Sequence, residues 1–165
     1  SAVFRMEKLC FLNGGLFPEM HRARPIQKLF NSPLGFILSH LMGEKAFRRS
    51  FSQVFGPDTQ PTDEELKAFW TLVNYKQGKL NTHKLIRYIE DRKQHRERWV
   101  NALKETPVPI RLIDGLLDPV SGGHLVEYYQ QQITDADIVE LPDVGHYPQV
   151  EAPDRVAAAV LDFFG

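Results

Sequence analysis

Residues 110–120 read IRLIDGLLDPV, and residues 137–148 read DIVELPDVGHYP. Each segment begins with a short apolar run that is typical of a buried strand, and continues into a turn that contains glycine and proline. Helical spacing of apolar residues follows each turn, over 123–133 and over 152–164. A strand-helix-strand-helix order predicts a parallel sheet with right-handed crossovers. The fold class expected from these segments is therefore α/β.

A third apolar run lies far upstream, at Lys8 to Asn13 (KLCFLN), and Gly14-Gly15 ends it. We expect a buried strand here, whose glycines allow a sharp exit at positive φ. About three parallel strands with flanking helices are thus predicted, from residues 1–19 and 105–165. Residues 20–104 are expected to form an inserted block of helices, because their apolar residues recur at helical spacing.

Two helices in this prediction carry clear signals. Thr62 followed by Glu65 is a capping-box pattern, which marks a helix start. A longer helix is expected over 82–104, begun by a Thr82 cap. The apolar residues expected to face inward from this helix and from the last one include Leu85, Trp99, Val156, Leu161 and Phe164.

The composition of the 165 residues is that of a globular protein, with 42% hydrophobic and 25% charged residues. A net charge of -1 gives no general attraction to nucleic acid. No apolar run approaches the roughly 20 residues of a membrane span, and no secretory leader is recognisable, so a cytoplasmic location is expected. The single cysteine, Cys10, excludes an intrachain disulfide. Nucleotide-binding glycine loops and close histidine pairs are absent from the sequence, so we expect neither cofactor nor metal.

Two polar residues follow the predicted strands at the end where parallel sheets bind ligands. Asp118 comes five residues after Ile113, and His146 comes five residues after Leu141. The outgoing loops of adjacent parallel strands meet at one edge. A carboxylate there can bond one imidazole nitrogen and leave the other free as a base. Taken alone, Asp118 is explained more plainly as the start of an Asp-Pro turn, and His146 as an ordinary loop residue. Only the two together favour a catalytic role.

The loops Gly115–Val120 and Asp143–Pro148 resemble the acid and histidine loops of the α/β-hydrolase fold. The helical block 20–104 resembles the cap of that fold in place and size, and the resemblance covers essentially the whole chain. It implies a hydrolase of a small hydrophobic substrate, with Asp118 and His146 as the acid and the histidine of a catalytic triad.

Residues 12–19 and 98–103 carry a narrower resemblance, to a protein close to the haloalkane dehalogenase and epoxide hydrolase branch of the fold. In that branch the nucleophile is usually an aspartate, which forms an alkyl-enzyme ester that the histidine then hydrolyses with water. This resemblance implies cleavage of a haloalkane or an epoxide more than of an ordinary ester.

The nucleophile of this fold stands on a strand-to-helix elbow flanked by glycines, ahead of the acid, and no such elbow occurs in the sequence. In the resembled fold, the strand 8–13 directly follows the strand and helix of the nucleophile. We therefore expect the C-terminal portion of a longer hydrolase, inactive by itself. The strand 8–13 would then have an unpaired apolar edge, which favours a homodimer through that edge.

The remaining expectations concern substrate binding and one alternative function. Phe17, Trp70, Tyr75 and Tyr147 are candidates to line the pocket, and the resemblance makes Tyr75 and Tyr88 candidates to hold an epoxide oxygen. For each tyrosine a core or surface position is the plainer explanation. The alternative is a non-catalytic module, in which the helices of 62–104 bind a partner. The charge run RKQHRER at 92–98 is explained most simply as a solvated helix face.

Overall fold

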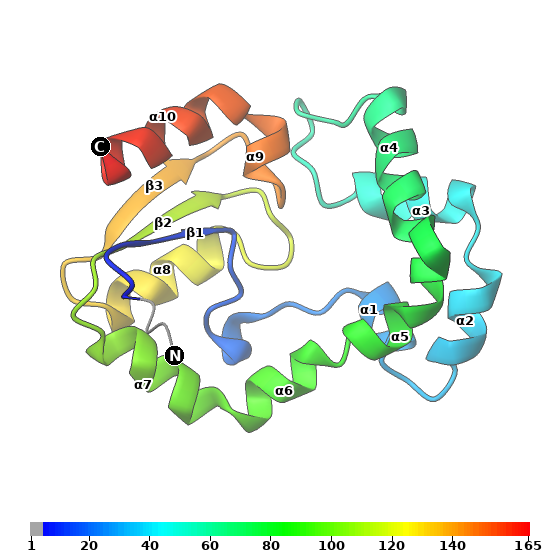
Figure 1. Cartoon of the computed structure of the whole chain (residues 1–165), viewed down its shortest axis with the longest axis horizontal. Coiled ribbons are helices and arrows are strands. Elements are labelled where there is room, and N and C mark those ends of the chain that lie inside the picture. The colour runs from blue at the N-terminus through cyan, green and yellow to red at the C-terminus, as the bar shows by residue number, and fades with distance from the viewer. Residues whose placement is uncertain (1–4) are drawn as a thin grey trace.

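Three parallel strands form the centre of the computed structural model, which describes residues 5–165 (Figure 1). They are β1 (Leu9–Leu12), β2 (Ile110–Gly115) and β3 (Asp137–Leu141), side by side in that order. Leu112 of β2 is in register with Phe11 on one side and with Ile138 on the other. The predicted parallel sheet is therefore confirmed, with β2 as its central strand.

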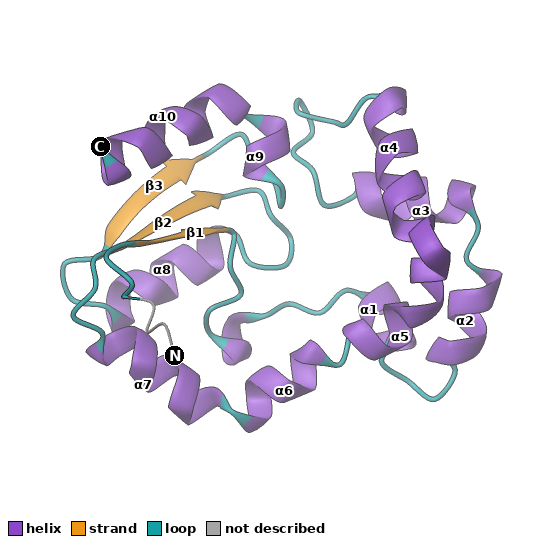
Figure 2. Ribbon diagram, viewed as in Figure 1, coloured by secondary structure: helices purple, strands orange, loops and turns teal. Residues whose placement is uncertain are grey.

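Helices cover both faces of this sheet (Figure 2). In chain order they are η1 (Pro18–Met20), α1 (Pro25–Phe30), α2 (Gly35–Leu41), α3 (Glu44–Ser52), α4 (Asp63–Asn74), η2 (Tyr75–Asn81), α5 (Thr82–Leu85), α6 (Tyr88–Gln94), α7 (Arg96–Glu105), α8 (Gly123–Gln132), α9 (Pro148–Glu151) and α10 (Pro153–Phe164). Helices α7 and α8 lie on one face of the sheet, and α10 lies on the other.

Alternation along β2 builds one core on each face, because successive side chains of a strand point to opposite sides. Leu112 packs with Val100 of α7 and with Leu125 and Tyr129 of α8. The next residue, Ile113, packs on the other face with Val156 of α10. Both β2 side chains are fully buried. The connections fixed in this way carry the loops that follow β2 and β3 to one end of the sheet (Figure 1).

Helices α1 to α6 gather beyond that end of the sheet, at the right in Figure 1. The capping box that starts α4 is present, since Thr62 Oγ1 accepts from the Glu65 amide at 3.2 Å and the Glu65 carboxylate accepts from the Thr62 amide at 2.7 Å. Helix α7 is different, because its Val100 belongs to the core of the sheet. The division at residue 104 stays a prediction, but α7 packs with the α/β part.

The prediction of one long helix over 82–104 is wrong. The chain there forms α5, α6 and α7, with a break at His95, whose φ of -105° and ψ of 18° are not helical. Thr82 is not the N-cap that was expected: it is the first residue of α5, and Asn81 occupies the N-cap position. The breaks change the phase of the apolar stripe, which leaves Leu85 70% and Trp99 43% exposed.

Two further local predictions fail for geometric reasons. In α10 the inward stripe runs through Val156 and Phe163, so Leu161 and Phe164 fall on the next face and are exposed. The positive φ at the exit of β1 belongs to Asn13, at 40°, and no glycine among the described residues has a positive φ. Asparagine tolerates this region because its short polar side chain bonds locally.

Within residues 5–165, no helix is both long enough and apolar enough to cross a membrane.

Candidate active site

Asp118 and His146 meet at the end of the sheet where β2 and β3 terminate. Strand β2 extends to Gly115, so Asp118 follows it by three residues rather than by the five expected from the sequence. His146 Nδ1 lies 2.7 Å from Asp118 Oδ2. The carboxylate is fully buried, and the imidazole is 29% exposed. The carboxylate accepts from Nδ1–H, which fixes the tautomer and leaves Nε2 as an acceptor.

Four groups donate hydrogen bonds to the Asp118 carboxylate. Besides His146 they are the Ser121 hydroxyl at 2.8 Å, the Val120 amide at 2.7 Å and Asn13 Nδ2 at 3.1 Å. Burial by itself would raise the pKa of Asp118. The hydrogen bonds from His146, Val120 and Ser121, with the charge of the imidazolium, outweigh burial and lower that pKa. Asp118 is therefore held as a carboxylate at neutral pH.

Asn13 ties the end of β1 to this carboxylate. Its Nδ2 also donates to the Gly115 carbonyl at 3.2 Å, and its Oδ1 accepts from the Gly115 amide at 2.7 Å. The Asn13 carbonyl oxygen also lies 3.2 Å from the Ser121 hydroxyl, so the single proton of that hydroxyl is shared between this carbonyl and the closer Asp118 carboxylate. The positive φ of Asn13 turns this side chain back across the sheet end. Asn13 is thus a positioning residue for Asp118.

Glu151 holds the histidine loop against the helical segment. Its carboxylate accepts from the amides of Gly145 at 2.7 Å and Tyr147 at 2.9 Å, on the two sides of His146. It also accepts from the Gly56 amide at 2.8 Å and the Thr59 hydroxyl at 2.6 Å. The His146 amide itself donates to the Val54 carbonyl at 2.8 Å. The backbone on both sides of His146 is therefore fixed by contacts that cross from the α/β part to the connection between α3 and α4.

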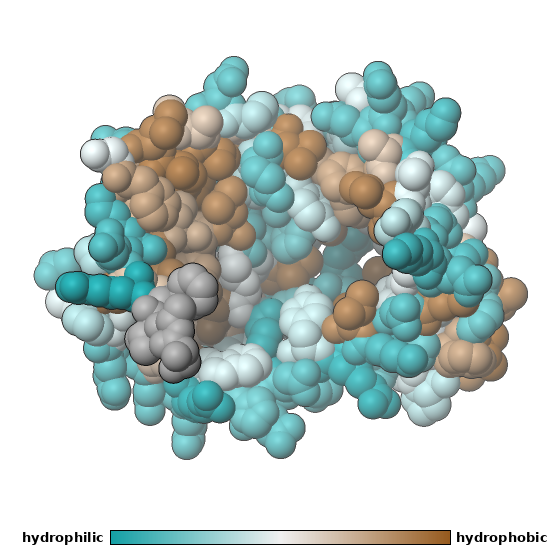
Figure 3. Space-filling model, viewed as in Figure 1, coloured by the Kyte–Doolittle hydropathy of each residue, from teal (hydrophilic) through white to brown (hydrophobic). Residues whose placement is uncertain are grey.

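Aromatic side chains surround the exposed side of His146. The Tyr147 ring lies 4.9 Å from the imidazole and nearly perpendicular to it. Phe51 and Phe55 contact Tyr147 at centroid distances of 5.0 and 5.3 Å, and Phe69 lies at 6.1 Å. The molecular surface is hollowed between the α/β part and helices α4 and α5 (Figure 3). The site thus combines an imidazole base with an aromatic wall.

The four residues expected to line the pocket lie in different places. Tyr147 is beside His146. Trp70 is half-buried within the helical segment, 5.4 Å from the Phe47 ring. Phe17 is fully buried in the core between the sheet and α8, against Tyr128 and Tyr129, and Tyr75 is 68% exposed on the surface. We therefore leave Phe17 and Tyr75 out of the proposed site. The other tyrosine considered, Tyr88, is 41% exposed at the start of α6, and its ring lies 6.3 Å from the His21 ring.

The sequence did not predict the roles of Asn13 and Glu151, which hold Asp118 and the backbone around His146 in place. Asn13 had a usable signal, because it is a polar residue at the carboxyl end of a predicted strand. Glu151 belongs to the stretch 151–153, which follows the histidine loop in the resemblance to the α/β-hydrolase fold, but its contacts with the loop were not predicted. No group of metal-ligating side chains occurs among residues 5–165.

A model of the Alpha/beta hydrolase family matches residues 3–159, which is most of the chain. The chain belongs to this family. The three parallel strands are thus part of an α/β-hydrolase fold, as the loops at Asp118 and His146 suggested.

Curated relatives of this α/β hydrolase are similar in sequence and longer. The Mycobacterium tuberculosis protein LipZ, which is named as a hydrolase, is 37% identical over 158 residues, covering 96% of this chain and 55% of LipZ. The mouse mesoderm-specific transcript protein is 38% identical over 162 residues, covering 96% of this chain and 48% of its own length. The narrower resemblance at residues 12–19 and 98–103 is to this second protein. The chain spans about half the length of the curated relatives it matches.

Solved structures show the same α/β-hydrolase fold at low sequence identity. A haloalkane dehalogenase from Bradyrhizobium elkanii aligns with a TM-score of 0.74 and 16% identity, over 94% of this chain and 58% of that one. A protein described as an epoxide hydrolase from Klebsiella pneumoniae aligns with a TM-score of 0.70 and 19% identity, over 96% and 58%. At these identities the likeness concerns the fold alone.

Proposed function

We propose that this chain supplies Asp118 and His146 as the acid and the general base of a hydrolase triad whose nucleophile lies outside the 165 residues. The observation that carries the proposal is the 2.7 Å contact between His146 Nδ1 and the buried Asp118 carboxylate, at the ends of adjacent strands. Among the described residues, His146 Nε2 has no hydrogen-bond partner, so it is available to a water or a nucleophile. Below, "the whole protein" means the polypeptide that contains this chain together with its nucleophile.

The reaction then has two covalent steps. An aspartate carboxylate attacks the carbon that bears the halogen or the epoxide oxygen, and that bond breaks to release halide or an alkoxide that takes a proton from water. With a serine, His146 instead takes the hydroxyl proton as the oxygen adds to an ester carbonyl, and returns it to the departing alkoxide. Either route gives an enzyme ester. His146 Nε2 next removes a proton from water while the water oxygen attacks the ester carbonyl, and the enzyme–product bond breaks. The Asp118 carboxylate stabilises the imidazolium formed in this step, because the two are directly hydrogen-bonded.

A small hydrophobic substrate fits the surroundings of His146. Tyr147 is in contact with three phenylalanines of the helical segment, and Trp70 lies deeper in that segment. Such a wall offers apolar area and few polar partners, which is typical of pockets for small molecules. We therefore propose an epoxide, a haloalkane or an ester as substrate, with residues 20–104 as the cap over it. A cytoplasmic location belongs to the same proposal.

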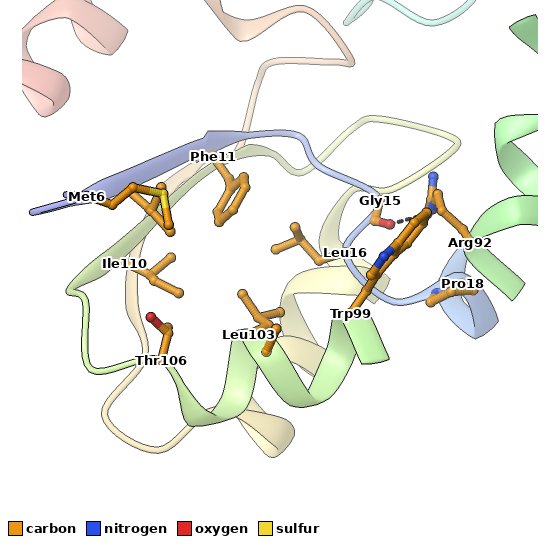
Figure 4. A pocket seen from close by; sticks show the side chains of 12 residues that line it. Met6, Phe11, Gly15, Leu16, Pro18, Arg92, Trp99, Leu103, Thr106 and Ile110 are labelled. Carbon is orange, nitrogen blue, oxygen red and sulfur yellow. Dashed lines mark hydrogen bonds between the residues drawn. The ribbon is translucent and has the colours of Figure 1, made fainter. Parts of the chain in front are cut away.

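The segment with the nucleophile has a suitable place along the free side of β1. An apolar pocket of about 540 Å³ lies there, between β1 and α7, and includes Leu9, Phe11, Trp99 and Leu103 (Figure 4). Figure 3 shows a further apolar surface over the strands and α10. Leu161 and Phe164 are among the exposed apolar residues of α10. A helix and a strand packed on this side would bury these surfaces next to the end of β1.

The proposal is tested by comparing the whole protein with the 165-residue chain alone. Both are assayed with p-nitrophenyl acetate, styrene oxide and 1-chlorobutane. We expect the whole protein to turn over at least one of these substrates and the chain alone to give no covalent intermediate by mass spectrometry, because the bond-forming oxygen is missing. Turnover by the purified chain that disappears in His146→Ala would show that the nucleophile is within the 165 residues.

We also propose that the isolated chain forms a homodimer through β1. Leu9 and Asn13 direct their amides to β2, at 2.9 and 3.1 Å from carbonyl oxygens, so the alternate amides of Cys10 and Leu12 point to the free edge. Light scattering should give about twice the 19.0 kDa of one chain. Dilution to monomer should increase the rate at which a thiol reagent labels Cys10. A monodisperse monomer at every concentration would contradict the homodimer.

One observation favours the non-catalytic alternative for the helices of 62–104. Leu72, Tyr75 and Leu85 are each about two thirds or more exposed, which is unusual for large apolar side chains so near one another in the sequence. A partner protein could cover them. This candidate predicts a partner that binds the whole protein whether or not His146 is intact.

A further inference from the structure

His21 is a buried imidazole without a partner, next to the proposed catalytic pair. It follows η1, where its amide donates to the Pro18 carbonyl at 3.3 Å. Both ring nitrogens are buried, and neither has a hydrogen-bond partner among residues 5–165. Burying a polar group without a hydrogen bond is costly. A group from outside the described chain is therefore needed to satisfy this ring.

The surroundings of His21 favour its neutral form. Burial and the positive charge of Arg92 lower the pKa of His21, against the opposite effect of Asp118, and the result is about 4. A neutral imidazole has one N–H donor and one acceptor nitrogen. The chain at His21 is in contact with the Asp118 loop, since the amide of the next residue, Arg22, donates to the Val120 carbonyl at 3.1 Å.

Arg92 of α6 is a half-buried cation without a carboxylate. Of the other cations in 92–98, Lys93 is paired with Glu90 and Arg96 with Glu19, whereas Arg98, like Arg92, forms no ion pair among the described residues. Arg92 has no acidic partner within ion-pair distance among the described residues, and its one hydrogen bond donates from Nη2 to the Gly15 carbonyl (Figure 4). Gly15 has no side chain, and a Cβ there would collide with the guanidinium. Since a guanidinium has five N–H donors, most of them remain available.

Tyr88 joins His21 to Arg92. Its ring lies 6.3 Å from the His21 ring and nearly perpendicular to it, and the Arg92 guanidinium carbon lies 5.5 Å from the same ring. Tyr88 is 41% exposed, and its partial burial raises its pKa despite the opposing charge of Arg92, so its hydroxyl stays protonated and can donate. His21 and Arg92, from two separate segments, thus lie on the same tyrosine ring and form one cluster with Tyr88.

We propose that His21, Arg92 and Tyr88 form a binding site for a carboxylate of the substrate, which would make the substrate an acidic small molecule with an apolar remainder. The inference rests on the proposed function, because the site lies beside His146. An anion fits because one group is a cation without a carboxylate partner and the other two can donate to oxygen. The negative charge of Asp118 repels a bound carboxylate only weakly, since four hydrogen bonds already compensate the Asp118 carboxylate.

The test measures binding of benzoate and of neutral benzamide to the whole protein at pH 7 by isothermal titration calorimetry. These probes have the same ring and differ in charge. We expect benzoate to bind about 10-fold tighter than benzamide or more, because a hydrogen bond to a charged group stabilises a complex more than one to a neutral group. Arg92→Gln and His21→Phe should each remove this preference. Arg87→Gln, which removes an exposed charge just ahead of α6, should retain it.

Equal affinities for benzoate and benzamide in the parent protein would overturn the site, and so would a preference that survives His21→Phe. His21→Phe decides the matter if Arg92→Gln disturbs the Gly15 loop and does not fold. The assay needs no turnover, so it separates the two proposals. Benzoate binding that depends on Arg92 in a protein without hydrolase activity would leave the carboxylate site standing. Turnover of neutral esters that depends on His146, without a benzoate preference, would leave only the hydrolase.

Discussion

His146→Ala should lower the turnover of the whole protein by roughly a thousandfold, within the 10²- to 10⁴-fold range of general acid–base catalysis. The physical reason is that Nε2 is the base nearest to the water that hydrolyses the enzyme ester, and the variant has no other base within hydrogen-bond distance of Asp118. Single-turnover kinetics checks the result: with an aspartate nucleophile the ester should form and accumulate in the variant, and with a serine it should form slowly, because His146 is then also the base for attack.

Asp118→Asn should give a loss of similar size, since an amide cannot stabilise the imidazolium and leaves Nδ1 with a different tautomer. His95→Ala is the matched control, because His95 is exposed at the α6–α7 break, away from the pair. Full turnover by both the His146 and Asp118 variants would reject the triad assignment and favour the interaction module.

Asp114→Asn should make the protein more stable above pH 8. The Asp114 side chain is fully buried in β2, and neither carboxyl oxygen has a hydrogen-bond partner among residues 5–165. Burial, followed by the charges of Asp118 and Glu140, raises the pKa of Asp114 to about 8. The folded protein therefore keeps a proton on Asp114 that the unfolded chain releases near pH 4.

The proton on Asp114 determines how the free energy of unfolding changes with pH. Between about pH 4 and pH 8 the folded state binds more protons at Asp114 than the unfolded state, so the free energy of unfolding falls as pH rises. Above pH 8 the carboxylate is charged in both states, and the full penalty is present. From about 1.4 kcal/mol for each pH unit, the penalty is on the order of 5 kcal/mol at most.

Urea unfolding between pH 4.5 and pH 8.5 measures this effect. The parent should lose stability across the range, whereas Asp114→Asn should lose much less and be the more stable of the two at pH 8.5. The amide stays buried, so little advantage is expected at pH 4.5. Asp58→Asn is the control, because Asp58 is exposed. A parent protein that is as stable at pH 8 as at pH 5 would mean that Asp114 has an unrecognised partner.

The α/β part of the fold could be predicted from sequence because its signals are local. The apolar runs that became β2 and β3 are each bounded by turn residues, and Thr62 with Glu65 marks a helix start within four residues. The helix breaks between α5 and α7 were not predictable in this way. Helical spacing continues through residues 82–104, and it is the packing of Val100 into the sheet core that fixes where α7 must lie.

The site residues that could be predicted are likewise those whose position depends on local sequence and strand order. Asp118 and His146 could be paired in advance, because the strand order of a parallel sheet brings successive outgoing loops together. Tyr147 is near the pair simply because it follows His146. The positions of Phe17, Trp70 and Tyr75 depend on how helices pack, and an aromatic residue on a helix suits a core, a surface or a pocket equally well. His21 and Arg92 gave no sequence signal, since an isolated histidine and a charge run are common.

Glu151 has a consequence for how this family can be re-engineered. The helical segment leaves and rejoins the α/β part at two points in the chain, so a designer would exchange it by cutting there. Glu151 adds a third attachment, at Gly56 and Thr59, in the middle of the exchanged piece. A graft that alters residues 54–59 would remove two of the four donors to a carboxylate that also holds the backbone around His146. A graft of the helical segment therefore has to preserve 54–59 if the backbone on both sides of His146 is to keep its present position.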